Sequence, residues 1–280
     1  MSVTAADFDF VSKLVRQRAA IVLEPGKEYL VVSRLLPLAR ESGLASIGDL
    51  VHQIRSPSGA ALATRVVEAM TTNETSWFRD SHPFTLLTKT LLPALGESRK
   101  QERTIRIWCA AASTGQEPYS IAMLLTDWLA TRPGWSASIL ATDLSEEVLA
   151  RARTGRYRQL EVNRGLPAPL LVKHFHRAGT EWELSDSIRK MVTFRPLNLA
   201  VPFPPMPPFD IVFCRNVLIY FDTTTRTQVL TRITKTMRPD GALLLGAAES
   251  TLSSDTNLER IQVDRGIYHR PRSGGGRTRP

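Results

Sequence analysis

The chain has 280 residues, of which 42% are hydrophobic, and it carries a formal net charge of +9. This length suits one large domain or two unequal domains, each with its own core. The apolar runs fall short of the ~18 residues that a membrane-spanning helix needs, and the N-terminus MSVTAADFDF has acids where a secretion signal carries Lys or Arg. We therefore expect a cytoplasmic protein with no membrane insertion.

The first 70 residues are predicted to be helical throughout. Apolar residues recur at helical spacing in four segments, 8–23, 29–43, 45–55 and 57–70. Gly43 marks the end of the second segment, and Pro57 fits early in the first turn of the fourth. We assign residues 1–72 to an all-α N-terminal domain.

A polar and aromatic segment, TTNETSWFRD, follows at residues 71–80. It places Asn73, Thr75 and Arg79 beside an aromatic pair, Trp77-Phe78. A surface loop does not need two adjacent aromatic side chains, and a protein core does not accept Asn, Thr and Arg without polar partners. The composition of this segment points to a binding or catalytic site.

The rest of the chain is predicted to alternate strands and helices. Residues 73–103 form a linker, with a connecting helix at 82–96 and a polar hinge after it. Buried strands are then predicted at 104–111, 136–144, 191–199, 209–217 and 242–250, the last preceded by a turn at RPDG, and helices at 115–130, 146–153 and 223–237. This alternation predicts a doubly wound, mostly parallel sheet. Ligands bind such sheets beyond the carboxyl ends of the strands.

Cysteine usage and charge exclude several classes of site. Cys109 and Cys214 lie inside apolar strand segments, so we expect buried, reduced thiols rather than a disulfide or a metal site. No zinc-finger spacing, RNA-binding signature or recognition-helix pattern accompanies the basic charge, and we expect no nucleic-acid partner. The Gly, Pro and Arg content of residues 272–280 predicts a disordered basic tail.

The first predicted strand is followed by AAASTGQEPYS. Small residues let the backbone pass close to a ligand, while Gln116 and Glu117 open the next helix. One glycine is too few for a dinucleotide fingerprint, and the Gly-Lys-Thr ending of a P-loop is missing. A carboxylate beside this turn suits a ligand with a positive group or hydroxyls. Glu117 also fits a second interpretation, as an acid that the helix dipole favours.

Polar residues also end two other predicted strands. Asp143 ends the second strand, where an acid can accept hydrogen bonds from both ribose hydroxyls of a nucleoside. It could instead cap the 146–153 helix, although Ser145 can supply that cap by itself. In FDIVFCRNVLIYFD, Arg215 and Asn216 follow four apolar residues, and such polar groups need partners from the fold or from a ligand.

Five segments resemble those of one family in order and spacing: TTNETSWFRD, AAASTGQEPYSIAML, ATDLSEEVLARARTGRY, PLNL and FCRNVLIYFD. They are similar to segments of the CheR-type chemotaxis receptor glutamate O-methyltransferases, and the likeness covers roughly residues 60–270. The resemblance implies a receptor-recognising helical domain and a Rossmann-like methyltransferase domain over 104–271, with a small β-subdomain at about 174–192. It implies that S-adenosylmethionine is the cofactor and S-adenosylhomocysteine the product. The acceptors would be glutamates on the cytoplasmic helical domains of chemoreceptors.

The resemblance also assigns site residues. The implied cofactor contacts are Asn73, Thr75, Arg79, Glu117, Asp143, Asn198, Leu199, Arg215 and Asn216. Arg79 is expected to hold the acceptor carboxylate, and Tyr220 either positions the acceptor or packs as an aromatic. A glutamate side chain has a pKa near ~4.3 and is already an ionised nucleophile at neutral pH, so neither a general base nor a metal is expected. Glu74 and Gln116 depart from the residues usual in relatives.

Receptor recognition is less closely defined by the sequence. Relatives that bind a receptor C-terminal peptide carry a longer loop between two short strands, whereas only AGT separates HFHR from EWEL here. We therefore expect no peptide tether, although a tight turn could preserve the same binding edge. Docking would instead use basic residues of the helical domain, Lys13, Arg16, Arg18 and Arg34, on a monomeric enzyme.

Two other functions remain open from the sequence. One is a methyltransferase of the same fold that acts on a small-molecule carboxylate, which the four N-terminal helices disfavour. The other is a non-catalytic adaptor that binds the cofactor or a nucleotide as a signal. Retention of Arg79, Asp143 and Asn216 disfavours the adaptor.

Overall fold

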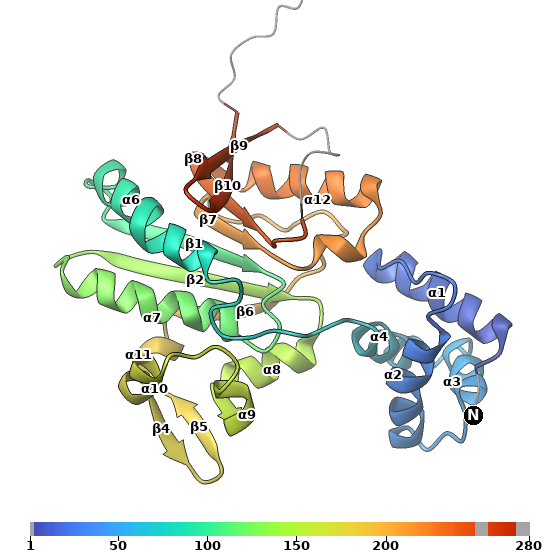
Figure 1. Ribbon diagram of the computed structural model, residues 1–280. Helices are drawn as coiled ribbons and strands as arrows, with labels where there is room; N and C mark the ends of the chain where they lie inside the picture. Colours follow the sequence, from blue (N-terminus) through green and yellow to red (C-terminus); the bar gives the residue numbers. More distant parts are fainter. Residues whose placement is uncertain (1–2, 250–256, 273–280) are drawn as a thin grey trace, which may run out of the picture.

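The computed structural model describes residues 3–249 and 257–272. It shows a helical domain beside a larger α/β domain, with the segment between α4 and α5 crossing from one to the other (Figure 1). The arrowheads of the central strands point toward the side on which the helical domain lies. Positions 273–280 of the predicted tail lie outside the described residues.

The helical domain contains α1 (Ala5–Ala19), α2 (Glu28–Glu41), α3 (Ile47–Ile54) and α4 (Ala60–Ala69). These helices bury one apolar face each around a shared core, which includes Val15, Leu35, Leu50 and Val66. Side chains of Thr4 and Ser46 cap α1 and α3 by accepting a backbone N–H in the first turn. The predicted all-α N-terminal region is confirmed.

Two predicted helix boundaries are wrong. The first helix ends at Ala19 rather than continuing to residue 23, because Ala20 adopts a left-handed conformation with a φ of 55° and caps it. Ile21 then forms an isolated β-bridge with Phe221 of the other domain. Pro57 lies in the turn before α4 and not inside the helix.

The connecting helix runs through α5 (His82–Leu86), the π-helical turn η1 (Leu87–Leu91) and α6 (Leu92–Ser98). Pro93 follows the widened turn, and proline has no N–H to donate to the carbonyl four residues before it. The predicted helix at 82–96 is therefore present, with a local change of pitch.

Among the described residues the main sheet has seven strands in the order β6-β2-β1-β7-β8-β10-β9. Five of them run parallel: β1 (Thr104–Ala110), β2 (Ser136–Asp143), β6 (Val192–Pro196), β7 (Phe209–Cys214) and β8 (Met237–Leu245). The hairpin of β9 (Leu258–Val263) and β10 (Gly266–Pro271) adds to β8 in antiparallel orientation. The predicted doubly wound, mostly parallel fold is confirmed, whereas the hairpin was not predicted.

Helices cover both faces of this sheet. Ile105, Ile107 and Cys109 of β1 pack in one core with α6 and with α7 (Gln116–Ala130). Trp108 and Ala110, which alternate with them, pack in a second core with α12 (Thr223–Lys235). α8 (Glu146–Thr154) connects β2 to the small subdomain. Cys109 and Cys214 are buried free thiols, as expected, and burial raises the pKa of each well above its usual value.

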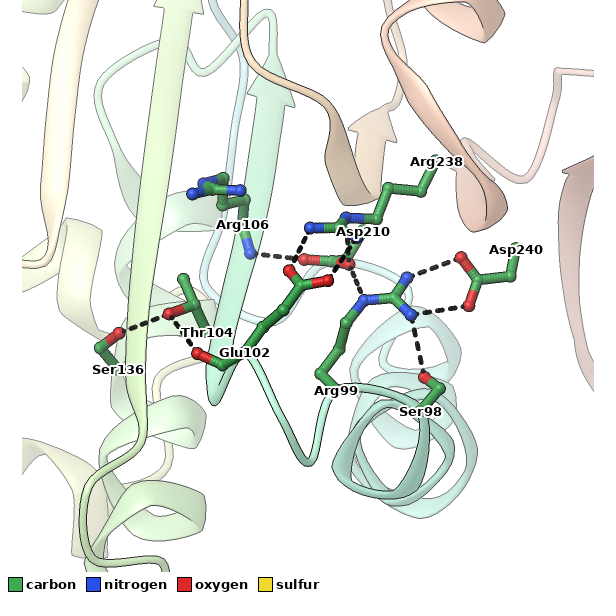
Figure 2. Close-up of polar contacts among 9 residues, drawn as sticks. All are labelled: Ser98, Arg99, Glu102, Thr104, Arg106, Ser136, Asp210, Arg238 and Asp240. Atoms are coloured by element: carbon green, nitrogen blue, oxygen red, sulfur yellow. Dashed lines mark hydrogen bonds and ion pairs between the residues drawn. The ribbon is translucent and has the colours of Figure 1, made fainter.

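The predicted turn at RPDG lies inside β8. Phe209 pairs with Met237 and Ile211 with Ala242, so residues 238–241 bulge out of the ladder. The bulge brings Asp240 to Arg99, whose Nη2 lies 2.6 Å from the Asp240 Oδ1, while the Arg99 Nε donates to Asp210 at 2.8 Å (Figure 2). This ion-pair cluster fixes the C-terminal end of α6 to the end of the sheet at which the parallel strands begin.

The small sheet has three antiparallel strands among the described residues, in the order β3-β5-β4. They are β3 (Arg156–Arg158), β4 (Phe175–Ala178) and β5 (Glu181–Leu184), accompanied by α9 (Gln159–Val162), α10 (Ala168–His174) and α11 (Asp186–Arg189). The range 174–192 is therefore too narrow at its start, and its last residue already belongs to β6. A two-residue turn joins β4 to β5, so the hairpin is as tight as predicted, and β4 lies at the edge of this sheet.

None of the helices in residues 3–249 and 257–272 is long and apolar enough to cross a membrane.

Candidate functional site

A cavity that is partly open to solvent lies at the carboxyl ends of β1, β2 and β7. The loops after these strands form its walls, together with the segment after α4, the segment after β6 and the end of α1. The structure brings all of the predicted site residues to this one cavity: Asn73, Thr75, Arg79, Glu117, Asp143, Asn198, Leu199, Arg215, Asn216 and Tyr220. The role of each residue in binding a ligand stays a prediction.

The aromatic residues of the 71–80 segment anchor it rather than face the cavity. Trp77 is 1% exposed and packs edge-on against Tyr157 and Phe175 of the small sheet, with ring centroids 4.9 and 5.5 Å away. The backbone N–H of Trp77 donates to the Arg164 carbonyl at 3.0 Å. A Cβ at Gly165 would collide with the Trp77 carbonyl oxygen, so this close approach requires glycine.

The backbone after Trp77 is held in an unusual conformation. Phe78, Asp80 and Ser81 have positive φ values of 49°, 66° and 44°. The Phe78 N–H donates to the Ser120 hydroxyl at 3.3 Å. Arg215 holds the other side of the turn. Its Nη2 donates to the Arg79 carbonyl at 2.8 Å and to the Asp80 Oδ2 at 2.7 Å. The surrounding structure thereby presets the position of Arg79.

Arg215 also pairs with the acid that opens α7. Its Nη1 lies 2.6 Å from the Glu117 Oε2, and both side chains are largely buried. Burial raises the pKa of Glu117, and the charge and hydrogen bonds of Arg215 oppose that rise. Arg215 was predicted as a cofactor contact. In this structure its two terminal nitrogens serve Glu117 and the 79–80 turn, so it lines the cavity and also supports two of its walls.

Asp143 ends β2 and joins two loops. Its Oδ2 accepts the Ser113 N–H at 2.8 Å and its Oδ1 accepts the Ser145 N–H at 3.1 Å. Burial raises the pKa of Asp143, and these backbone hydrogen bonds oppose the rise. The capping interpretation of Asp143 is wrong, because the Ser145 side chain caps α8 by accepting the Val148 N–H. A carboxylate oxygen accepts more than one hydrogen bond, so Asp143 retains capacity for ligand hydroxyls.

The helical domain closes one side of the cavity. The Asn198 Nδ2 donates to the Arg18 carbonyl at 2.7 Å, and the Val22 N–H donates to the Tyr220 carbonyl at 3.1 Å. Ala19 and Ile21 line the cavity, and sequence reasoning did not identify either residue. Their apolar character gave no signal, because the role of both residues depends on how the two domains dock.

The predicted basic docking face is only partly available. Arg34 is half-buried, and its Nη1 donates to the Met70 and Thr71 carbonyls at 2.7 and 3.0 Å. It therefore fixes the start of the cavity-lining segment, and its assignment to receptor docking stays a prediction. Arg16 pairs with Asp222 across the two domains at 3.3 Å. Lys13 and Arg18 remain exposed.

Within the part of the chain that the structure describes, no group of three or more His, Cys, Asp or Glu side chains is arranged to hold a metal ion.

Comparisons with known proteins give two family matches and many similar chains. The model described as "CheR methyltransferase, all-alpha domain" matches residues 6–71, and "CheR methyltransferase, SAM binding domain" matches residues 73–267. Chemotaxis protein methyltransferase 1 of Pseudomonas aeruginosa is 41% identical over 274 residues, covering 96% of this chain and 99% of that protein. The chemotaxis protein methyltransferase of Vibrio parahaemolyticus is 40% identical, with coverages of 96% and 98%. That of Escherichia coli is 38% identical, with coverages of 95% and 90%.

Proposed function

The chain belongs to the CheR methyltransferase family, and from that premise we propose that it methylates glutamate carboxylates on the cytoplasmic helical domains of chemoreceptors. It is an S-adenosylmethionine-dependent methyltransferase of chemotaxis, and its product from the cofactor is S-adenosylhomocysteine. The observation that carries the proposal is the shared cavity, in which two buried acids, Glu117 and Asp143, lie with the guanidinium of Arg79.

The chemistry of this donor set fits the cofactor. Glu117 suits the ammonium of the amino-acid portion, and its pairing with Arg215 keeps it oriented at the start of α7. Asp143 suits the ribose hydroxyls, because it ends β2 beside the loop after β1. Small residues in that loop, Ala111 and Ser113, have positive φ values of 73° and 50° and line the cavity. They allow the backbone to approach a ligand closely.

The residues of the chain need only to align the acceptor carboxylate with the methyl group of the cofactor, because neither group needs further activation. Bound S-adenosylmethionine supplies a methyl group that its sulfonium already activates. The acceptor carboxylate is ionised at neutral pH, since its ordinary pKa is near ~4.3. Arg79 holds that carboxylate by charge-assisted hydrogen bonds, and the preset 78–81 turn fixes where Arg79 stands. Tyr220 is the second positioning candidate, since it lines the same cavity. Alignment and exclusion of water then provide the rate enhancement.

The helical domain is the proposed receptor-docking element. Its exposed basic residues, Lys13 and Arg18, lie on α1, whose last turn contacts the segment after β6 at the cavity. Charge complementarity with acidic receptor helices would guide docking. We propose a monomeric cytoplasmic enzyme that needs no receptor C-terminal peptide. The tight turn between β4 and β5 supports this, although β4 still offers an edge.

Two measurements test this function against its alternatives. Calorimetry with S-adenosylhomocysteine reports cofactor binding, and transfer of a labelled methyl group to receptor membranes reports the acceptor. An adaptor would bind S-adenosylhomocysteine and transfer no label. An enzyme for small-molecule acids would label a free carboxylate and leave the receptor unlabelled.

A further inference from the structure

The carboxylate of Glu249 accepts four backbone hydrogen bonds from two separate strand ends. Its Oε2 accepts the N–H groups of Asn216 and Gly246 at 2.8 and 2.7 Å. Its Oε1 accepts those of Val217 and Leu218 at 2.8 and 2.7 Å. Asn216 follows β7 and Gly246 follows the neighbouring parallel strand β8, so one side chain ties the two carboxyl ends together.

The surroundings are built for this one carboxylate. Consecutive backbone N–H groups that converge on a point form an anion-binding concavity, and charge-assisted hydrogen bonds are stronger than neutral ones. A Cβ at Gly246 would lie 2.7 Å from the Glu249 Oε2 and 2.8 Å from the Asn216 nitrogen. Only glycine leaves room there for the carboxylate.

The turn that Glu249 holds is a wall of the cavity. Asn216 has a positive φ of 59°, a conformation that costs free energy outside glycine and persists only where neighbours enforce it. Asn216, Val217 and Tyr220 line the cavity. Without Glu249, three successive N–H groups of this turn would lose their acceptor, and the turn would relax.

We propose that Glu249 is a positioning residue of the methyl-transfer site. It acts through the 216–220 turn, setting Asn216 for the cofactor and Tyr220 for the acceptor. The part of this inference that concerns the cofactor rests on membership of the family, and the part that concerns the acceptor rests on the proposed function. S-adenosylhomocysteine binding therefore tests it without any assumption about the acceptor.

The test is Glu249→Gln, which keeps the size of the side chain. A glutamine offers one acceptor oxygen and turns an NH2 group toward two N–H donors. We expect the dissociation constant for S-adenosylhomocysteine to rise about tenfold or more, the change that loss of one charged hydrogen bond produces. The turnover number should fall as well, while the KM for the receptor stays within about twofold, since docking uses the helical domain.

A second variant and a control separate positioning from stability. Gly246→Ala keeps Glu249 but displaces its carboxylate from the turn, and it should likewise weaken the binding of S-adenosylhomocysteine. Asp240→Asn breaks the ion-pair cluster at the other end of the sheet, where the parallel strands begin (Figure 2). It should lower the melting temperature and leave the dissociation constant unchanged. If Glu249→Gln behaved like Asp240→Asn, with a lower melting temperature and wild-type binding and turnover, Glu249 would be structural and the proposal would be wrong.

Discussion

Arg215 and Glu117 form a buried ion pair in the lining of the cavity, with the guanidinium Nη1 2.6 Å from the carboxylate Oε2. Their side chains are 1% and 12% exposed. Glu117 begins α7, whereas Arg215 follows β7, so the pair joins elements that are about a hundred residues apart in the chain. Arg215 thus opposes the rise that burial causes in the pKa of Glu117, the residue proposed to bind the ammonium of the cofactor.

Replacing Arg215 with Met should destabilise the protein in a pH-dependent way. Removal of one partner of a buried pair typically costs roughly 3–5 kcal/mol, because the other charge is left uncompensated. Burial already raises the pKa of Glu117 while Arg215 opposes the rise, so the substitution raises that pKa further. Urea denaturation at several pH values measures the effect.

The sign of this pH dependence follows from linkage. An acid whose folded-state pKa is raised contributes stability that is present below its unfolded pKa, near ~4.3, and lost as the pH rises through the folded pKa. The free energy of unfolding of Arg215→Met should therefore lie closer to the wild-type value near pH 4 than at neutral pH, while the loss of the Arg215 hydrogen bonds to the Arg79 carbonyl and to Asp80 remains at every pH. Equal destabilisation at all pH values would mean that Glu117 is not the uncompensated partner.

Asp143→Asn should weaken S-adenosylhomocysteine binding by about 10- to 100-fold, equivalent to roughly 1.5–3 kcal/mol for a charged hydrogen-bonding group. The side chain keeps its size but loses one of two acceptor oxygens, which already serve Ser113 and Ser145. Calorimetry measures the constant. The matched control is Ser145→Ala, which removes the cap of α8 and should cost about 1 kcal/mol of stability without changing binding. If Asp143→Asn bound S-adenosylhomocysteine with wild-type affinity, Asp143 would not be the residue that binds the ribose hydroxyls.

Arg79→Ala should depress methylation far more than stability. Among the described residues, the Arg79 guanidinium donates to the Glu74 carbonyl alone, at 3.1 Å, so little folding energy depends on it. Loss of a charged clamp predicts about a 10- to 100-fold drop in kcat/KM, with a nearly unchanged melting temperature. Arg79→Lys should recover only part of the lost kcat/KM, because an ammonium cannot form the two parallel hydrogen bonds that a guanidinium makes with a carboxylate. If the affinity for S-adenosylhomocysteine fell as much as kcat/KM, cofactor binding would account for the whole effect of Arg79 and its role as the acceptor clamp would be wrong.

Receptor recognition should depend on salt and not on a receptor tail. Electrostatic docking through Lys13 and Arg18 is screened within a Debye length of about 8 Å at physiological ionic strength. The KM for receptor should therefore rise steeply with added salt. Arg18→Glu should raise it at low salt, whereas Lys100→Glu, an exposed lysine on the other domain, should not. Competition between a free receptor-tail peptide and methylation, at micromolar concentration, would show that the edge of β4 binds a tether.

The parts of the fold that the sequence predicts are those with long, regular patterns. The strand ending in Cys214 is buried along its whole length and the strand ending in Asp143 is buried in its last three residues, and such burial requires a sheet with helices on both faces. Between residues 156 and 189 the elements are only three to seven residues long, as in β3 and α11. Hydrophobic periodicity cannot define elements that short, so β3 was missed and the subdomain was placed too late in the chain.

The residues of the site likewise divide into those that the sequence reveals and those that it does not. Polar residues at the ends of buried strands, such as Asp143 and Asn216, are visible in the sequence because they need partners there. Ile21 and Glu249 are not, because one depends on domain docking and the other on a fold that brings four N–H groups to a single carboxylate. The hydrogen bonds of Arg34 were not predicted either, because a charged residue on a helix has the same pattern whether it faces solvent or donates to carbonyls.

The most direct test of the function uses methyl-labelled S-adenosylmethionine, the purified enzyme and a chemoreceptor cytoplasmic fragment. Glutamate methyl esters release their label as methanol in base, whereas methyl groups on nitrogen do not. We predict base-labile label on the fragment, absent from a fragment whose modified glutamates are replaced by alanine. An enzyme that binds S-adenosylhomocysteine but leaves the fragment without base-labile label would contradict the account.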